Sequence, residues 1–335
     1  MDSRAIGVFD SGLGGLSVVR CLKKKMPGES LLYFGDSART PYGSKAVSTI
    51  RRFSEEIISF LVSHDVKAVV IACNTVSSTC LDELHEKFPE LPIVGIIEPV
   101  CRAMAKQFAG KRQEKLGIIG TKVTVESGVY PATLQALAPD LQLVQKACPL
   151  LVPLIEEGLA KHEMVQMALH YYLDDFVREN RLNGLILGCT HYPLIRAQIE
   201  QLYPDLALYD PAEAEVDALA ALLAGRDALA PEDLSERDRS PVLDRYYASD
   251  LSENYMRMIR EITEDPQAVI RFRSVEPGSS EPPGAKTSCP PGLIQCPARR
   301  GAEPLRVSSR LRPQQSEHPV SSAEASGAAL KRERV

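Results

Sequence analysis

The sequence predicts an α/β fold in which short buried strands alternate with helices around a mainly parallel sheet. Eight apolar runs, most of them rich in Val, Ile or Leu, recur along the chain: IGVF, LLYFGD, AVVIAC, PIVGII, KLGIIG, LQLVQKA, GLILGC and ALYD. Near-continuous apolar runs are typical of parallel strands that helices cover on both faces. Helical patterns separate these runs, and such alternation joins strands through right-handed crossovers. The runs fit either one sheet or two smaller α/β domains.

Two of the intervening segments carry the apolar stripe of an amphipathic helix. In residues 47–61 the stripe consists of Val47, Ile50, Ile57, Ile58 and Leu61. In residues 194–202 it consists of Leu194, Ile195, Ile199 and Leu202. Because these positions share one face of a helix, both segments are predicted to pack against the sheet.

The composition is that of a soluble globular protein, since 44% of the 335 residues are hydrophobic and 25% are charged. A net charge of -5 argues against a nucleic-acid-binding protein, which would need a surplus of Lys and Arg. No apolar run approaches the roughly 18 residues that span a bilayer, and MDSRAIGVFD lacks the pattern of a signal peptide. Eight cysteines are too sparse for a disulfide scaffold. We therefore expect a cytoplasmic protein with reduced thiols and no membrane partner.

The composition changes sharply near Val275. Residues 275–335 hold 9 of the 24 prolines and contain no Phe or Tyr. So little apolar surface cannot offset the entropy that a chain loses on ordering, which predicts a disordered C-terminal tail. The Arg, Pro and Ser bias of this tail would also suit a partner-binding segment, but an uninvolved extension is the better interpretation.

Several apolar runs end in polar or reactive residues, at the edge where doubly wound sheets bind their ligands. These segments are DSGLGG at 10–15, GDSARTPYGS at 35–44, CNT at 73–75, TKVT at 121–124 and CTHYP at 189–193. The turn with Gly12, Gly14 and Gly15 exposes backbone N–H groups that can receive an anion. It lacks the spacing of a dinucleotide-binding motif and the lysine of a P-loop, so alone it is best interpreted as a tight turn.

Cys73 and Cys189 give the stronger signal, because each follows a buried strand and precedes hydroxyl or amide groups. Helix N-termini at such strand ends stabilise a thiolate, which lowers a thiol pKa from about 8.5 toward neutrality. A lone buried cysteine is usually a small packing residue. That interpretation is kept for the other cysteines before the tail: Cys21, Cys80, Cys101 and Cys148.

Two thiols on opposite walls of one site suit the inversion of a carbon stereocentre. One sulfur removes a proton from one face of the carbon, and the other returns a proton to the opposite face. Each thiol then needs a neighbour that manages its proton, and Asp10 and His191 are the candidates. For His191 the alternative is a hydrogen-bonded structural histidine.

Seven motifs in this order carry a family resemblance: FDSGLGG, YFGDSARTPYG, ACNT, VGIIEP, GTKVTVESGVY, CPLLVPLIEEG and GCTHYPLI. With them the sequence resembles the glutamate racemases, the cofactor-independent members of the aspartate/glutamate racemase superfamily. The resemblance runs from Ile6 to about Asp250. The cysteine pair alone would indicate only the superfamily, whereas DSGLGG together with PYG and GCTHYP is typical of the glutamate-specific enzymes.

The resemblance implies a role for each chemical group. Cys73 and Cys189 would be the two acid/base residues on opposite faces of Cα, assisted by Asp10 and His191 respectively. Two further carboxylates would lie near the site: Asp36, and in the PLIEEG motif Glu156 in preference to Glu157. No metal and no cofactor would take part.

The same resemblance implies which residues line or bind the substrate, glutamate. They are Asp10, Ser11, Pro41, Tyr42, Gly43, Ser44, Asn74, Thr75, Thr121, Thr124, Thr190 and His191. Apart from the nearby Arg39, no Lys or Arg accompanies them, although glutamate carries two carboxylates. Recognition would therefore rest on hydroxyls, the Asn74 amide and backbone N–H groups.

The implied architecture is two doubly wound α/β domains with mainly parallel sheets that face each other across the active site. Residues 1–97 with 208–274 would form one domain and residues 98–207 the other, each carrying one cysteine with its partner. Residues 275–335 have no counterpart in the family core. Homodimers are common in the family, and D-glutamate made in the cytoplasm would supply peptidoglycan biosynthesis.

Three alternatives stay open on the sequence alone. A superfamily racemase for aspartate or a hydantoin would use the same two thiols. A non-catalytic amino-acid-binding protein would keep the pocket, although two oxidation-prone thiols bring a mere binder little. A redox protein would join Cys73 to Cys189, which needs Cα atoms within about 7 Å and leaves no room for a substrate.

Overall fold

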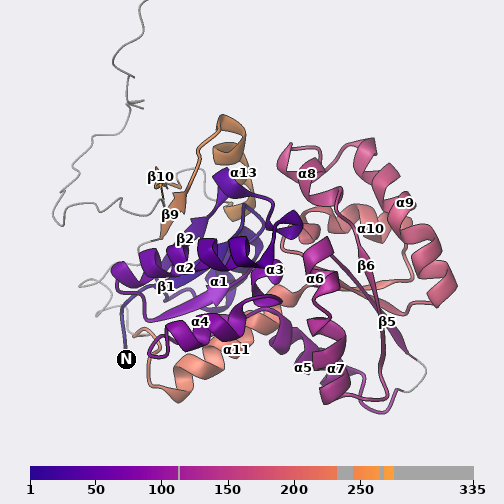
Figure 1. The fold of residues 1–335 in the computed structure, drawn as a ribbon, viewed down its shortest axis with the longest axis horizontal. Helices are drawn as coiled ribbons and strands as arrows, with labels where there is room; N and C mark the ends of the chain where they lie inside the picture. Colours follow the sequence, from indigo (N-terminus) through magenta and orange to yellow (C-terminus); the bar gives the residue numbers. More distant parts are fainter. Residues whose placement is uncertain (112–113, 232–243, 265–267, 275–335) are drawn as a thin grey trace, which may run out of the picture. The chain divides into compact units, whose positions relative to one another are not determined.

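The computed structural model describes residues 1–111, 114–231, 244–264 and 268–274. In these residues two parallel sheets stand side by side, with helices covering both (Figure 1). The first sheet has the strand order β10-β9-β2-β1-β3-β4 and the second has the order β6-β5-β7-β8. Every strand pair in both sheets is parallel. The predicted α/β fold class with mainly parallel sheets is confirmed.

The first sheet is built from both ends of the described chain. Its strands are β1 (Ile6–Asp10), β2 (Leu31–Gly35), β3 (Ala68–Ile71), β4 (Ile93–Gly95), β9 (Arg245–Ala248) and β10 (Ile270–Phe272). Asp10 pairs with Gly35, and Phe9 pairs with Ile71. This register brings the residues that follow β1, β2 and β3 to one edge of the sheet.

The second sheet is formed by the middle of the chain. Its strands are β5 (Lys115–Gly120), β6 (Gln142–Ala147), β7 (Gly184–Gly188) and β8 (Ala207–Tyr209). Gly120 pairs with Gly188, so Thr121 and Cys189 follow adjacent strand ends. β8 pairs with β7 and spans the boundary predicted between residues 207 and 208. The predicted domain limits stay a prediction.

Twelve α-helices connect the strands in the described residues. They are α1 (Leu16–Lys25), α2 (Val47–Ser63), α3 (Asn74–Ser77), α4 (Leu81–Lys87), α5 (Ile97–Gln107), α6 (Lys122–Glu126), α7 (Val129–Leu137), α8 (Leu151–Glu156), α9 (Glu163–Asn180), α10 (Arg196–Leu202), α11 (Pro211–Gly225) and α13 (Glu253–Thr263). Three short 3₁₀ helices complete this part of the chain: η1 (Ser37–Arg39), η2 (Tyr42–Ser44) and η3 (Tyr192–Ile195). No helix in the described ranges has the length and apolar character that crossing a membrane requires.

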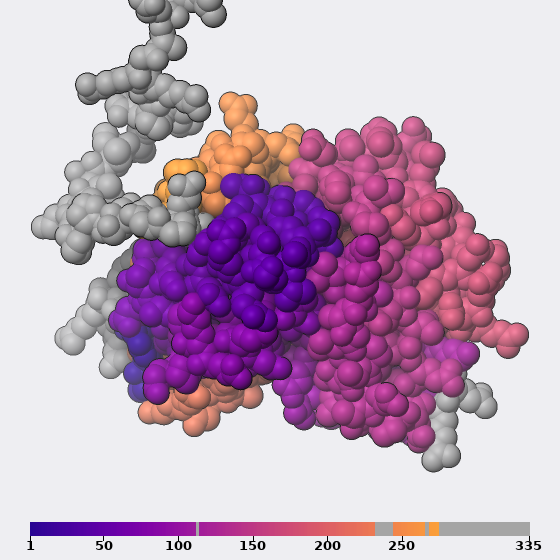
Figure 2. Space-filling model, in the orientation of Figure 1, coloured from indigo at the N-terminus to yellow at the C-terminus, as the bar shows by residue number. Residues whose placement is uncertain are grey.

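One of the three apolar clusters in the described residues contains side chains of both sheets. It contains Val8 of β1 and Val70 of β3 together with Ile118 of β5 and Ile186 of β7. Helices α5 and α11 pack on each other and contribute Val100 and other residues to the same core. In the space-filling view the indigo surface of the N-terminal part of the chain lies directly against the magenta surface of its middle part (Figure 2). Packed apolar side chains therefore hold the two sheets together.

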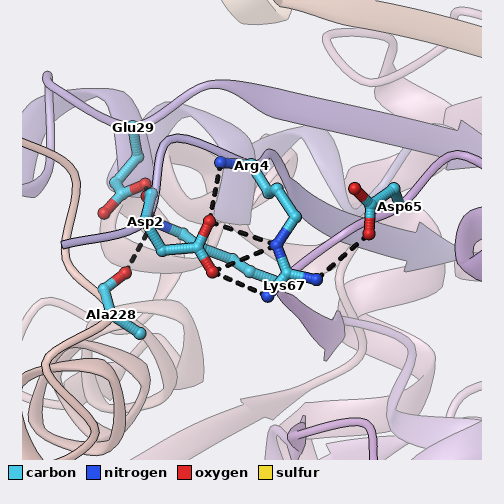
Figure 3. A network of polar contacts seen from close by, with 6 residues as sticks. All are labelled: Asp2, Arg4, Glu29, Asp65, Lys67 and Ala228. Carbon is cyan, nitrogen blue, oxygen red and sulfur yellow. Dashed lines mark hydrogen bonds and ion pairs between the residues drawn. The ribbon is translucent and has the colours of Figure 1, made fainter.

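A buried ion pair lies at the amino ends of the strands of the first sheet, away from the edge where the residues after β1, β2 and β3 meet. Lys67 precedes β3, and its side chain is fully buried with Nζ 2.6 Å from Oε2 of Glu29. The same ammonium donates hydrogen bonds to the carbonyl oxygens of Asp2 and Ala228, each at 2.8 Å. Figure 3 shows this cluster together with the exposed pairing of Arg4. Since three acceptors surround Lys67, the buried charge is compensated.

All eight predicted apolar runs form strands, whereas β9 and β10 were not predicted. The stripe predicted on α2 is buried except for Val47, which is 42% exposed at the first position of the helix. The helix predicted over residues 194–202 begins as η3 and continues as α10. The predicted tail, residues 275–335, lies outside the described residues.

Candidate active site

Both cysteines singled out from the sequence line one small cavity at the carboxyl ends of the two sheets. The lining residues are Ser11, Pro41, Tyr42, Gly43, Cys73, Asn74, Thr75, Thr121, Val152, Cys189, Thr190 and His191. Eleven of these residues were predicted, and Val152 was not. The lining contains no Lys or Arg among the described residues.

Cys73 is the N-cap residue of α3 and follows β3 by one residue. Its thiol donates a hydrogen bond to Ser11 Oγ at 3.5 Å, and the backbone N–H of Val76 faces the sulfur. Burial, and secondly the negative charge of Asp10, raise the pKa of Cys73 to about 12. This sulfur is therefore a protonated thiol at neutral pH, and the lowered pKa expected from its place at a helix N-terminus is wrong for Cys73, because burial and the Asp10 charge outweigh that effect.

Asp10, the last residue of β1, connects the first sheet to the turn after β7. Its Oδ1 accepts a hydrogen bond from the Thr190 hydroxyl at 3.0 Å, and its Oδ2 accepts one from the Gly12 N–H at 3.0 Å. Burial raises the pKa of Asp10 above its usual value, although the charge of His191 and these hydrogen bonds oppose the shift. Gly14 allows this approach, because a Cβ at that position would overlap Thr190 and lie 2.6 Å from His191 Nδ1.

Cys189, His191 and Glu156 form a line of three side chains. His191 Nδ1 lies 3.7 Å from Cys189 Sγ, and His191 Nε2 lies 2.5 Å from Glu156 Oε1. Burial acts to lower the pKa of His191. The hydrogen bonds to Cys189 and Glu156 and the Glu156 charge outweigh it and hold this pKa well above its usual value. The imidazole is consequently a cation beside a sulfur. Glu157 is exposed to solvent.

A cluster of three hydroxyls lies where the two sheets meet. Thr75 Oγ1 lies 3.0 Å from Thr121 Oγ1 and 3.3 Å from Thr124 Oγ1, and the last two are 3.0 Å apart. Beside it, Asn74 Oδ1 accepts a hydrogen bond from Tyr130 at 2.6 Å. Asn74 Nδ2 is buried and has no hydrogen-bond partner among the described residues. These groups give the cavity donors without a side-chain cation.

Asp36 lies behind the cavity wall. Its Oδ2 accepts hydrogen bonds from the Tyr42 hydroxyl and from Arg39 Nε, and its Oδ1 accepts one from Ser249 Oγ at 2.6 Å. Arg39 in turn bonds Glu56 at 2.5 Å, so its charge is used in this network. Asp36 therefore reaches the cavity only through Tyr42. Four further predicted residues also stand outside the lining: Asp10, Ser44, Thr124 and Glu156.

Sequence reasoning missed several residues that hold the site. Tyr130 on α7 bonds Asn74, and Ser249 after β9 bonds Asp36. Tyr33 on β2 and Tyr255 on α13 both donate hydrogen bonds to the Gly12 carbonyl oxygen, at 2.6 and 3.0 Å. Tyr130 stands in one of the quoted motifs, whereas the other contacts join distant segments and leave no local signal.

Residues 6–219 match the family described as Asp/Glu/Hydantoin racemase. The chain belongs to this family. It is 40% identical to the glutamate racemase of Geobacter metallireducens in an alignment of 259 residues, and this alignment covers 77% of this chain and 92% of that protein. It is 46% identical over 227 residues to a glutamate racemase of Thermus thermophilus, which covers 68% of this chain and 82% of that protein. This isomerase therefore carries its two thiols on a racemase fold.

Solved structures agree with the family assignment. The glutamate racemase of Francisella tularensis in complex with D-glutamate superimposes with a TM-score of 0.74 at 31% identity, over 82% of this chain and 99% of that one. The Thermus thermophilus enzyme in complex with beta-chloro-D-alanine gives a TM-score of 0.69 at 40% identity, over 82% and 98% of the two chains. The arrangement of the two sheets in this racemase is thus that of crystallised relatives.

Proposed function

We propose that this isomerase interconverts L-glutamate and D-glutamate, using Cys73 and Cys189 as its two acid/base groups. The observation that carries the proposal is the pair of free thiols in one buried cavity, each with its own polar neighbours. The similar enzymes named above are glutamate racemases, and one of them was crystallised with D-glutamate. Aspartate is the competing substrate, because it presents the same Cα with a shorter side chain.

The reaction breaks one Cα–H bond and forms another on the opposite face. A thiolate takes the proton from Cα, the electron pair is left on the α-carbon and its carboxylate, and the opposite thiol donates a proton. Cys73, whose pKa is raised to about 12, is the resting acid. Cys189, whose Sγ lies 3.7 Å from His191 Nδ1, is assigned as the group that acts on the opposite face. After turnover the two sulfurs have exchanged protonation states, which suits the reverse direction.

Substrate recognition is assigned to neutral donors that line the cavity. In this proposal Asn74 Nδ2 and the hydroxyls of Thr75 and Thr121 bind the carboxylate oxygens, which is supported by the buried Nδ2 that has no hydrogen-bond partner among the described residues. Groups fixed in a water-poor cavity stabilise developing negative charge better than water does, because they need no reorganisation. Asp36 and Glu156 are assigned as positioning residues, which act through Tyr42 and His191 respectively.

The proposal is tested by incubating the purified protein with L-glutamate in deuterated water, in the presence of reducing agent and without pyridoxal phosphate. We expect the circular dichroism signal to decay to zero while deuterium replaces the Cα proton. L-Aspartate, run in parallel, should react far more slowly. If the signal is stable with glutamate and decays with aspartate, the substrate is aspartate. If neither amino acid reacts, a binding protein is favoured.

The cellular setting extends the proposal. We assign the enzyme to the cytoplasm, where D-glutamate supplies peptidoglycan biosynthesis, and we assign it a homodimeric state. Growth of a D-glutamate-requiring bacterial strain on expression of this chain tests the first assignment. Light scattering at micromolar concentration tests the second, with a monomer mass contradicting it. Exposed apolar side chains spaced along α9 support association: Met164, Met167 and Tyr171.

The domain limits are proposed on the same footing. We assign residues 1–97 with 208–274 to one unit and residues 98–207 to the other, and we propose that residues 275–335 are dispensable for racemisation. Truncation after Ser274 should leave kcat and KM unchanged. A large loss of activity in the shortened chain would contradict this assignment.

A further inference from the structure

Helix α13 contacts both walls of the site through two consecutive residues. Tyr255 donates a hydrogen bond from its hydroxyl to the carbonyl oxygen of Gly12, at 3.0 Å. Asn254 donates one from Nδ2 to the carbonyl oxygen of Glu156, at 3.1 Å. Figure 1 shows α13 beside α8, above the first sheet. The family match ends at residue 219, so these contacts come from a part of the chain beyond it.

On the first wall the contact fixes the turn that orients Asp10. Gly12 accepts hydrogen bonds from Tyr255 and also from Tyr33, at 2.6 Å, while its own N–H donates to Asp10 Oδ2 at 3.0 Å. Gly35 leaves room for this arrangement, since a Cβ there would overlap the Tyr255 hydroxyl and the Gly12 carbonyl oxygen. Gly12 therefore holds the Asp10 carboxylate, and the hydrogen bonds from Tyr33 and Tyr255 hold Gly12 in place.

On the second wall the contact fixes the end of α8. Glu156 is the last residue of this helix, where carbonyl oxygens have no partner within the helix. Arg257 donates to Asn254 Oδ1 at 2.6 Å, which turns the amide so that Nδ2 faces the Glu156 carbonyl. The Glu156 side chain then meets His191 at 2.5 Å. The chain of contacts runs from α13 to the imidazole beside Cys189.

We propose that Asn254 and Tyr255 are positioning residues for the two proton transfers, Asn254 for the Cys189 side and Tyr255 for the Cys73 side. This rests on the proposed function, because it assigns one sulfur to each face of Cα. Proton transfer depends steeply on the placement of the reacting groups. A single helix that restrains both walls keeps the two acid/base groups in register with one bound substrate.

Two variants and a control test the proposal in the full chain. Tyr255→Phe removes the hydrogen bond to the Gly12 turn and Asn254→Ala removes the one to the end of α8, and in each variant kcat should fall about 5- to 10-fold with KM nearly unchanged. The control is Thr263→Val, which removes a hydroxyl that bonds the Ile259 carbonyl within the same helix. It should lower the melting temperature and leave kcat at the parent value. Asn254 is partly exposed, so its variant should fold even if Tyr255→Phe does not.

The decisive readout is the primary isotope effect for glutamate deuterated at Cα, measured from each enantiomer. Because the two directions begin at different sulfurs, Asn254→Ala should raise the isotope effect in one direction and Tyr255→Phe in the other. Equal changes in both directions, or a kcat that stays at the parent value while stability falls, would overturn the proposal. Turnover that survives Cys73→Ser or Cys189→Ser would instead overturn the two-thiol function on which it rests.

Discussion

The Nε2 atom of His191 lies 2.5 Å from Oε1 of Glu156, at the junction between the turn after β7 and the end of α8. The other ring nitrogen lies 3.7 Å from Cys189 Sγ, so the imidazole joins a carboxylate to a sulfur. The pKa of His191 stands well above its usual value because these contacts outweigh the effect of burial. The protonation of the His191 imidazole therefore depends on the Glu156 carboxylate, although Glu156 does not line the cavity.

Glu156→Gln should lower the pKa of His191, because the amide cannot supply the negative charge that stabilises the imidazolium. His191 then loses its proton at a lower pH, and the limb of the kcat/KM profile that reports it should move to lower pH. Loss of one charged hydrogen bond, worth about 1.5–3 kcal/mol, corresponds to a fall in kcat/KM of about 10- to 150-fold at neutral pH. The control is Glu157→Gln at the exposed neighbour, which should keep the parent profile. An unshifted profile in Glu156→Gln would refute the link.

Cys73→Ser and Cys189→Ser should each reduce racemisation by about 1,000-fold or more, because a hydroxyl is a far weaker proton-transfer group at this site. Both proteins should keep the far-ultraviolet circular dichroism of the parent. Cys21→Ser, at a half-buried position on α1, should keep full activity. Near-normal turnover in either site variant would contradict the assignment of two bases.

Lys67→Met should destabilise the fold by about 3–5 kcal/mol, because it leaves the Glu29 carboxylate buried without its cation. Adding Glu29→Gln should recover much of this loss. Arg4→Ala, which breaks a partly exposed pairing with Asp2, should cost no more than about 1 kcal/mol. Urea unfolding measures all three. Folded Lys67→Met protein should keep its kcat, since Lys67 lies at the amino ends of the strands, and a large fall in kcat would contradict this separation.

Glu215 on α11 gives a pH-dependent prediction. Both carboxyl oxygens are buried without a hydrogen-bond partner among the described residues. Burial, followed by the charges of Asp10 and Asp210, raises the pKa of Glu215 well above its usual value. The folded state thus binds a proton that the unfolded state has released, so stability falls as pH rises from the unfolded pKa to the folded one.

Glu215→Gln removes this titration while keeping a neutral side chain of similar shape. Urea unfolding should find the variant close to the parent below the ordinary carboxyl pKa and more stable than the parent at mildly alkaline pH. Each unit of pKa shift contributes about 1.4 kcal/mol to that difference. A constant difference between the two proteins across the pH range would show that Glu215 does not titrate in this way.

The strands and the two thiols could be predicted because their signals are local. A strand buried on both faces, such as β1 or β7, is a continuous apolar run, and the residue after it points to the ligand edge. β9 and β10 were missed because RYYA and IRF are short and only partly buried. The bonds from Ser249 to Asp36 and from Tyr255 to Gly12 span 213 and 243 residues. A hydroxyl that meets a distant acceptor has no signature in the residues beside it.

The cluster of Thr75, Thr121 and Thr124 has a consequence for handedness. Each hydroxyl can rotate, and in every pair either oxygen can be the donor. L- and D-glutamate have equal free energies in water, so an enzyme that turns one into its mirror image gains nothing by holding either more tightly. Thr75 and Thr121 line the cavity, and their hydroxyls can turn to donate or to accept without moving the backbone. Under the proposed function we expect such a wall to bind the two enantiomers with similar affinity, so that the difference between them is handled by the two sulfurs on opposite faces of Cα.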